Sequence, residues 1–588
     1  MFKNLQPLFP YMRRYWRAYL WGCLCTVLAN AIWVQFPHII GLASDDLAKG
    51  VTWHKVFGYA GLIMAVTIVH GILLFLMRWI IIGISRDIEF DLRNDLFAQL
   101  EKQSAAYYQE HRTGDIMARM TNDLNAVRML LGPAIMYTAN TVLFFAGALY
   151  FLLRISPFLT LAALAPMPLA SILIQFMGRR IHERFERIQA MFSDISAQAQ
   201  ENFSGARLVR AFAQEEAQIN AFERSNREYI RRSLRLVRLM GMLWPTLEFM
   251  LGVAMVISLL VGGHEVLTHR ISIGDFVAFN TFLLMLTWPI IALGYVVNLF
   301  ERGTASVVRI HELLTAQPTI DDRDAVVSSR PAEMIRGDIE FRNLHFAYTS
   351  ANGSAVEVLH GISLSIPAGS SLALVGPTGS GKSTLVNLVP RLYDAPPGTV
   401  LIDGRPVRDY PLDSLRAAVG FVPQETFLFS TTIHENIAFG VPSASASDVE
   451  RAAAAAHIRE EFDLFPNGRE TTVGERGLTL SGGQKQRTAL ARAILRNPRI
   501  LILDDALASV DTYTEERILE ELRRVMAGRT TILISHRIST VRHADRIAVL
   551  VRGRIAELGT HDELLELNGY YAGLFQKQLL EEELAVTH

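Results

Sequence analysis

The sequence lacks the features that stabilise small secreted domains or attract nucleic acid. It has two cysteines, Cys23 and Cys25, which lie two residues apart in one apolar run and would face different sides of a helix. We therefore expect neither a disulfide nor a cysteine metal site. The formal net charge of -1 provides no basic excess, so nucleic acid is not an expected partner.

Apolar residues, by contrast, are abundant. Half of the 588 residues are hydrophobic and 20% are charged. A chain of this length is too long for one ordinary core, and its composition is more apolar than that of most soluble proteins. A helix that crosses the bilayer needs roughly 20 apolar residues. Six runs meet this length, at about 18–43, 56–84, 133–153, 157–177, 242–263 and 275–298.

The first run superficially resembles a secretion signal, because it follows a basic segment and contains Ala29-Asn30-Ala31. We prefer an uncleaved first transmembrane helix, since the apolar stretch continues to about Ala43 and five more runs follow.

Two connections between the runs are long, polar and rich in arginine, at about 85–132 and 178–241, whereas the other three are short. The excess of arginine places these connections and both termini in the cytoplasm. Residues 181–229 carry mixed charge at helical spacing and are interrupted only at Ser204-Gly205. This pattern predicts long helices that project from the membrane.

A polar stretch at 316–337, which contains Asp321-Asp322-Arg323-Asp324, Ser328-Ser329 and Pro331, marks a linker. We therefore expect a membrane domain at 1–315 and a soluble α/β domain at 338–588, where strand-like runs alternate with helical segments.

A phosphate-binding loop is the strongest motif of the second domain. The run from Gly376 to Ser383 fits G-x-x-x-x-G-K-[ST], follows a strand-like run and precedes a helical one. Its backbone N–H groups would wrap the phosphates, Lys382 would reach the terminal phosphates, and the Ser383 hydroxyl is a candidate ligand of Mg²⁺.

Two further motifs are weak on their own. Asp504 ends a strand-like run, where a carboxylate can hold Mg²⁺ through water. The segment from Leu480 to Gln484 is, taken alone, a helix start capped by Ser481.

In this order, the motifs resemble one subunit of a bacterial ABC exporter of the half-transporter kind, from the N-terminus to about Lys577. The resemblance implies a six-helix transmembrane domain with long cytoplasmic helical extensions (type I ABC exporter), followed by an α/β P-loop nucleotide-binding domain. It also implies ATP and Mg²⁺ as cofactors, a position in the bacterial cytoplasmic membrane, and a signature at 480–484 that closes on ATP held by the opposite subunit.

Other positions take their roles from this resemblance. Tyr348 matches the aromatic residue that stacks on adenine, although an ordinary strand aromatic is the alternative, and Gln424 matches the loop glutamine that touches Mg²⁺. His536 matches the switch histidine at the γ-phosphate. The predicted nucleotide contacts are Tyr348, Gly376, Pro377, Thr378, Gly379, Ser380, Gly381, Lys382, Ser383, Thr384, Gln424, Leu480, Ser481, Gly482, Gly483 and Gln484. The predicted metal ligands are Ser383, Gln424 and Asp504, and the predicted catalytic residues are Asp505 and His536.

Four loop segments also match the family. Residues 471–477 resemble the loop ahead of the signature, and 509–511 occupy the cross-dimer communication loop. Residues 111–119 and 207–214 match the short helices that couple the two domains. In the membrane, His70, Arg78 and Glu248 are candidates for a central cavity, with snorkelling to the interface as the alternative for Arg78.

The departure from the family is Asp505, where the carboxylate that polarises the attacking water is usually Glu. A carboxylate about 1 Å too far away can cost on the order of a hundredfold in rate. In the resembling family this change is typical of one subunit of a heterodimer, so we expect a second half-transporter as partner. The alternative is a homodimer in which Asp505 is a working base.

The resemblance thus implies ATP-driven export of amphipathic or hydrophobic compounds, such as drugs or lipids. Two alternatives are a homodimeric lipid flippase and a regulatory subunit that senses ATP while its partner hydrolyses it.

Overall fold

The computed structural model describes residues 2–325, 334–349, 355–474, 477, 479–510 and 512–586. The chain divides into two compact units, one of Met1–Ala98 and Met117–Thr315, the other of Gln99–Ile116 and Ala316–His588. The second unit thus includes a short segment that follows the second apolar run. Several residues named above lie outside the described ones: Ser328, Ser329, Pro331, Glu475, Arg476 and Asp511.

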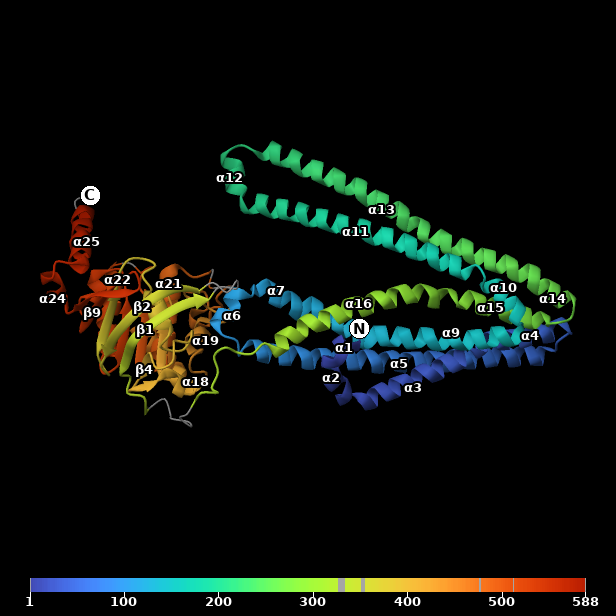
Figure 1. The fold of residues 1–588 in the computed structure, drawn as a ribbon, viewed down its shortest axis with the longest axis horizontal. Helices are drawn as coiled ribbons and strands as arrows, with labels where there is room; N and C mark the ends of the chain where they lie inside the picture. Colours follow the sequence, from blue (N-terminus) through green and yellow to red (C-terminus); the bar gives the residue numbers. More distant parts are fainter. Residues whose placement is uncertain are drawn as a thin grey trace. The chain divides into compact units, whose positions relative to one another are not determined.

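Helices build the first unit (Figure 1). They are α1 (Phe2–Leu5), α2 (Phe9–Arg14), α3 (Trp16–Trp33), α4 (Gln35–Ala48), α5 (Trp53–Leu100), α8 (Leu124–Met129), α9 (Ile135–Ile155), α10 (Pro157–Leu164), α11 (Met167–Ser204), α12 (Ala206–Ala211), α13 (Glu215–Ile257), α14 (Gly263–Leu267), α15 (Ile273–Met285) and α16 (Thr287–Thr315). The first four residues of α7 (Thr113–Ala118) belong to the second unit and its last two to the first.

All six apolar runs are helical, but they differ in continuity. Among the described residues, four helical segments are long and apolar enough to cross a membrane: Trp16–Ala48, Trp53–Leu100, Thr113–Ile155 and Glu215–Leu267. The other two runs are interrupted, one between α10 and α11 at Ala165-Pro166 and one between α15 and α16 at Leu286. Pro166 cannot donate a helical hydrogen bond, which accounts for the first break.

Close backbone contact joins α4 to α15. The backbone N–H of Gly274 donates to Oδ1 of Asp45 at 2.6 Å, and a Cβ atom on Gly274 would collide with the carbonyl oxygen of Gly41. Nearby, the Asn30 side chain donates to Asn140 Oδ1 at 2.8 Å and joins α3 to α9. Small residues and paired amides of this kind hold helices together where lipid removes the hydrophobic driving force.

The predicted polar helices form one long hairpin. In Figure 1, α11 and α13 run side by side and α12 closes their far end. The break lies at Gly205, as the sequence predicts, because the helix stops at Ser204 and restarts at Ala206.

Two sheets build the second unit. The strands of the larger sheet run in the order β10-β9-β3-β8-β7-β6, with β9 to β6 parallel, and those of the smaller antiparallel sheet in the order β2-β1-β4-β5. The strands are β1 (Ile339–Thr349), β2 (Ala355–Ile366), β3 (Ser371–Val375), β4 (Val400–Ile402), β5 (Arg405–Pro406), β6 (Val419–Val422), β7 (Ile500–Asp504), β8 (Thr530–Ile534), β9 (Arg546–Val551) and β10 (Arg554–Gly559).

Helices complete the second unit. They are α17 (Lys382–Asn387), α18 (Leu412–Ala417), α19 (Ile433–Ala438), α20 (Ala446–Ala455), α21 (Gly482–Leu495), α22 (Thr512–Met526), α23 (Ile538–Val541), α24 (His561–Glu566) and α25 (Tyr570–Val586), and α6 (Ala105–Glu110) also belongs to this unit.

The register of the larger sheet decides where the functional side chains lie. Ile534 of β8 pairs with Leu374 of β3 on one side and with Asp504 of β7 on the other. The carboxyl ends of these three parallel strands therefore meet at one edge, where ligands bind in open α/β sheets. All five residues of β7 and of β8 are buried, as the near-continuous apolar runs predict.

Candidate nucleotide-binding site

The loop after β3 has the backbone that a phosphate cradle needs. Gly381 precedes α17 with a φ of 101°, and a Cβ atom there would lie 2.8 Å from Leu359 Cδ2. Only glycine fits this left-handed, crowded position. The helix that starts at Lys382 then points its free N–H groups and the positive end of its dipole at the loop.

Lys382 is held inside this loop. Its ammonium donates to the carbonyl oxygens of Gly376 at 2.9 Å and Pro377 at 3.0 Å, and the residue is 7% exposed. Burial lowers the pKa of Lys382, while Asp504 and Asp505 act in the opposite direction. Ser380 is also buried, and its hydroxyl has no hydrogen-bond partner within the described part of the chain. Such a set of buried donors suits an anion.

A cavity of about 310 Å³ opens beside this loop. It brings together most of the predicted contacts, and two apolar residues complete it. The lining is Tyr348, Val358, Thr378, Gly379, Ser380, Gly381, Lys382, Ser383, Thr384, Gln424, Asp504, Asp505, Ile534 and His536. Residues from β1, the loop after β3, and the ends of β6, β7 and β8 thus converge, although they are far apart in sequence.

Asp504 is the buried carboxylate of the cavity, at 4% exposure. Burial raises its pKa, whereas a hydrogen bond from Ser383 and the charges of Lys382 and His536 lower it. The side chains of Asp504, at the end of β7, and Ser383, at the start of α17, are therefore in contact.

Asp505 follows Asp504 with its backbone fixed on both sides. Its N–H donates to the Ile534 carbonyl at 2.9 Å, and its own carbonyl accepts from Gln486 Nε2 at 3.4 Å. Its φ is 50°, a left-handed value that Asp tolerates better than most residues. The side chain is half-buried and lines the cavity.

The aromatic end of the cavity contains a small network. The Tyr348 hydroxyl donates to Thr384 Oγ1 at 3.2 Å, and its ring meets that of Tyr393 edge-on at 5.1 Å. The Tyr393 hydroxyl in turn accepts from Gln109 Nε2 of α6 at 2.7 Å. A chain of contacts thus joins α6 to the edge of the cavity.

The signature residues do not line this cavity. Ser481 caps α21 in a capping box with Gln484, in which the Ser481 N–H donates to Gln484 Oε1 at 2.8 Å and Ser481 Oγ accepts from the Gln484 N–H at 3.3 Å. Leu480 is buried, while Ser481 and Gly482 are exposed. The capping interpretation is thus correct, and the helix start faces away from the protein's own core.

Three residues of this region were missed in the sequence. Gln486 is buried at 6% exposure, and its side chain accepts from the Ser509 N–H at 2.8 Å while donating to the Asp505 carbonyl. It joins the signature helix to the loop after β7. Gln486 stands two residues past the signature, and Gln109 and Tyr393 belong to no motif, so only their spatial neighbours reveal them.

A phosphate loop, a strand-end carboxylate and a signature-type helix in one α/β unit, fused to a unit of membrane-length helices, define an ATP-driven membrane transporter. Comparison with known families agrees: residues 19–290 match the model of the ABC transporter transmembrane region, and residues 359–508 match that of the ABC transporter.

Individual relatives extend over nearly the whole chain. The probable multidrug resistance ABC transporter ATP-binding/permease protein YheI of Bacillus subtilis is 36% identical over 99% of this chain and 98% of its own length. The ATP-dependent lipid A-core flippase of Syntrophus aciditrophicus is 35% identical over 95% of this chain and 92% of its own. A solved bacterial Atm1-family ABC exporter with ATP bound has a TM-score of 0.77 at 30% identity, and the match covers 96% of this chain and 98% of that one.

The chain belongs to the ABC transporter family, as an exporter with fused transmembrane and ATP-binding domains. The fold predicted from the sequence, a type I exporter, is confirmed. Its C-terminal unit is an ATP-binding ATPase coupled to transport. Like other ABC exporters, the protein works as a dimer in the membrane.

Proposed function

We propose that this protein exports amphipathic or hydrophobic compounds, drugs or lipids, across the bacterial cytoplasmic membrane as one half of a heterodimer. In this proposal the nucleotide-binding unit and both termini lie in the cytoplasm. The chain contributes an impaired ATP site of its own and an intact signature for the site of its partner. The observation that carries the proposal is the anchored backbone of Asp505.

The anchoring matters because Asp is one methylene shorter than Glu. The Asp505 N–H is bound to β8 and its carbonyl to Gln486, so a backbone shift that restores the lost reach would break these two hydrogen bonds. A general base contributes roughly 10² to 10⁴-fold in rate, and a misplacement of about 1 Å removes much of that gain. Nucleotide binding, which depends on Lys382 and the loop, is unaffected by this loss.

Mg²⁺ fits the oxygen ligands of the site. Ser383 and Asp504 are hydrogen-bonded to each other, and Gln424 lines the same cavity. These are the hard oxygen donors that Mg²⁺ prefers, and they would leave room for water and phosphate oxygens. When bound, the ion would neutralise charge on the β- and γ-phosphates.

The signature supports the division of labour. Ser481 and Gly482 are exposed at the start of a 14-residue helix whose positive dipole end is free to meet a phosphate from outside the chain. The partner's ATP is the proposed occupant. This chain would then assist turnover through its signature more than through its own carboxylate.

The cargo class rests on the relatives. One is named for multidrug resistance and another for flipping lipid A-core. Both kinds of cargo combine an apolar part with a polar one, which suits a substrate that enters from the membrane.

The test measures the ATPase activity of three preparations. The first is this chain alone, the second is a half-transporter that is encoded by an adjacent gene and has Glu at the matching position, and the third is the two proteins together. We expect slow hydrolysis by this chain and fast hydrolysis by the pair. Asp505→Asn should change the rate of the pair less than about threefold. Robust hydrolysis by this chain alone that Asp505→Asn abolishes would overturn the heterodimer proposal in favour of the homodimer.

A further inference from the structure

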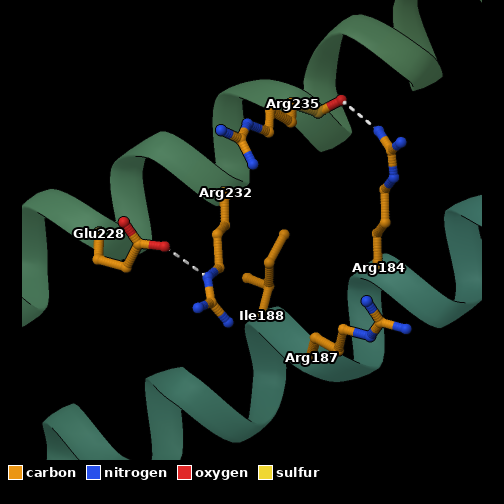
Figure 2. Close-up of a pocket in the computed structure, with 6 residues that line it drawn as sticks. All are labelled: Arg184, Arg187, Ile188, Glu228, Arg232 and Arg235. Atoms are coloured by element: carbon orange, nitrogen blue, oxygen red, sulfur yellow. Dashed lines mark hydrogen bonds and ion pairs between the residues drawn. The ribbon is translucent and has the colours of Figure 1, made fainter.

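A cavity lined by arginines lies between the two long helices of the hairpin. It has a volume of about 370 Å³ and is lined by Arg184, Arg187 and Ile188 of α11 and by Glu228, Arg232 and Arg235 of α13 (Figure 2). Ile188, at 8% exposure, is the apolar residue of the lining, and the four arginines surround it. No residue of this cavity belongs to the nucleotide site.

The arginines outnumber their internal partners. Glu228 accepts from Arg232 Nε at 2.8 Å and from Arg231 at 3.0 Å, and Arg184 donates to the Arg235 carbonyl at 3.2 Å. The guanidinium groups of Arg187 and Arg235 form no hydrogen bond or ion pair with the described residues. Segments 179–187 and 228–238 together hold eight arginines and three glutamates. The cavity therefore carries excess positive charge that an anion would neutralise.

The convergence of the arginines needs an explanation beyond membrane topology. Arginine is common on the cytoplasmic side of membrane helices. That tendency accounts for the number of arginines here, but it does not require four of them to meet around one cavity. Guanidinium groups bind phosphate through two parallel hydrogen bonds, which makes clustered arginines a characteristic phosphate site.

The end of the cavity that carries Arg184 and Arg235 lies nearest the lipid head groups. Arg184 lies seven residues after the apolar run that ends near 177, and Arg235 lies seven residues before the run that begins near 242. At 1.5 Å per residue, both are about 10 Å beyond the hydrocarbon edge, and Arg187 and Arg232, ten residues from the same runs, are about 15 Å beyond it. The head-group layer is roughly 5–8 Å thick, and an arginine side chain extends several ångströms back toward it.

Apolar side chains continue the same helix faces toward the membrane. On α11, Phe176 precedes Arg180 and Arg184 at intervals of four residues, and the Arg180 guanidinium lies 4.1 Å from the Phe176 ring centroid. On α13, Met242 lies seven residues after Arg235. Phe176 is 52% and Met242 63% exposed. The helix faces that carry Arg184 and Arg235 thus continue toward the membrane with exposed apolar side chains.

We propose that this cavity binds the phosphate-bearing head group of an anionic lipid from the adjoining leaflet. The arginines would hold the phosphate, and the acyl chains would lie along Phe176 and Met242. The proposal goes beyond ATP-driven export and stands whether or not Asp505 supports hydrolysis.

Lipid binding to the purified full-length protein tests this. The probe is dihexanoyl phosphatidic acid below its micellar concentration, and dihexanoyl phosphatidylcholine and pyrophosphate are the comparison ligands. We expect saturable binding of phosphatidic acid, weakened at least about tenfold by Arg187→Gln with Arg235→Gln. The matched control, Arg179→Gln with Arg224→Gln, removes the same charge from the same two helices outside the cavity and should change the Kd less than about twofold.

A charge-preserving pair, Arg187→Lys with Arg235→Lys, covers the case in which the glutamine pair does not fold. It keeps the charge but loses the guanidinium forks, so the Kd should rise about threefold. Three results would overturn the proposal. They are an equal loss of phosphatidic acid affinity in the cavity variants and the control variants, pyrophosphate binding as tight as that of phosphatidic acid, and the absence of saturable lipid binding.

Discussion

The two nucleotide-related regions of this chain differ in completeness. The cavity at the ends of β3, β7 and β8 contains a buried lysine, a buried carboxylate and the aromatic ring of Tyr348, all from one polypeptide. The start of α21 is exposed, satisfies its own backbone through the Ser481 cap, and has no part in that cavity. One region is a closed set of side chains from this chain, and the other is an exposed helix start that, in the proposed function, acts on the nucleotide of a second subunit.

The departure from the family pattern falls in the region that is otherwise complete. The cavity contains most of the residues expected to hold ATP, and the residue that departs from the expected pattern there is Asp505, whereas the segment 480–484 matches the expected signature. The proposed function therefore predicts that ATP binding and ATP hydrolysis can be separated in this chain, and each region can be tested by a substitution that leaves the other intact.

The largest effect is expected from Lys382→Ala. This change removes a buried ammonium from the phosphate loop, and we expect ATP to bind at least about a hundredfold more weakly, because charge-assisted hydrogen bonds to phosphate are lost. Equilibrium binding of a fluorescent ATP analogue measures this. Asp505→Asn is the matched control and should retain binding within about threefold.

Gly482→Ala examines the other region. In this chain a Cβ atom at Gly482 would lie 3.2 Å from Ser509 Cβ, a contact that a small shift relieves. We therefore expect the Tm and the ATP affinity of the isolated chain to be unchanged, within about 2 °C and twofold. The turnover of the pair should fall about tenfold or more, because the new methyl group would face the partner's nucleotide. A clear fall in the Tm of the isolated Gly482→Ala chain would instead assign the signature a purely structural role.

Asp504→Asn tests how the buried carboxylate affects the thermal stability of the nucleotide-free protein. Burial raises the Asp504 pKa, so the folded state holds a proton more tightly than the unfolded state does. A carboxyl of this kind stabilises the fold below its unfolded pKa of about 4, and this contribution is lost as the pH rises through the raised folded value. Without nucleotide at pH 7.5, the Asn variant should therefore melt about 2 °C higher than the unchanged protein.

The difference in melting temperature should shrink on acidification, as Asp504 becomes protonated. Thermal melts between pH 5 and 8, run on both proteins in the absence of ATP and Mg²⁺, measure it. An Asn variant that melts lower at every pH would show that the Asp504 charge stabilises the empty site.

The smallest effect is expected from Tyr393→Phe. The change deletes the 2.7 Å hydrogen bond from Gln109 but keeps the ring against Tyr348. Hydrogen exchange in α6 should become about five- to tenfold faster, as the loss of about 1 kcal/mol implies, while ATP affinity stays within twofold. Unchanged exchange in residues 105–110 would remove Tyr393 from the path between α6 and the cavity.

Much of this architecture could be predicted from the sequence. The phosphate loop, the strand before it and the carboxylates at the end of β7 follow from local patterns, because glycine spacing and apolar runs are read within a few residues. The break at Gly205 was also foreseen, since the flanking segments hold almost no other glycine or proline.

The rest depended on contacts between distant segments. The breaks at Ala165-Pro166 and Leu286 lie inside apolar runs whose hydropathy continues across them. The contacts of Gln109 with Tyr393, and of Gln486 with Asp505, join residues that no local motif connects. The predicted coupling segment at 111–119 begins just after α6, so the residue that touches Tyr393 precedes it.

The arginine cavity shows the same limit. The sequence shows many arginines near the apolar runs. That four of them meet around one cavity follows only from the pairing of α11 with α13 in the structure.

The most direct test of the account is Asp505→Glu in the isolated chain, reconstituted in lipid, with ATPase kcat as the measurement. Because the backbone at 505 is fixed by β8 and Gln486, the added methylene should bring the carboxylate to the reacting water and raise kcat at least about tenfold. ATP affinity should stay constant. An unchanged or lower kcat in the Glu variant would contradict the claim that Asp505 makes this site impaired.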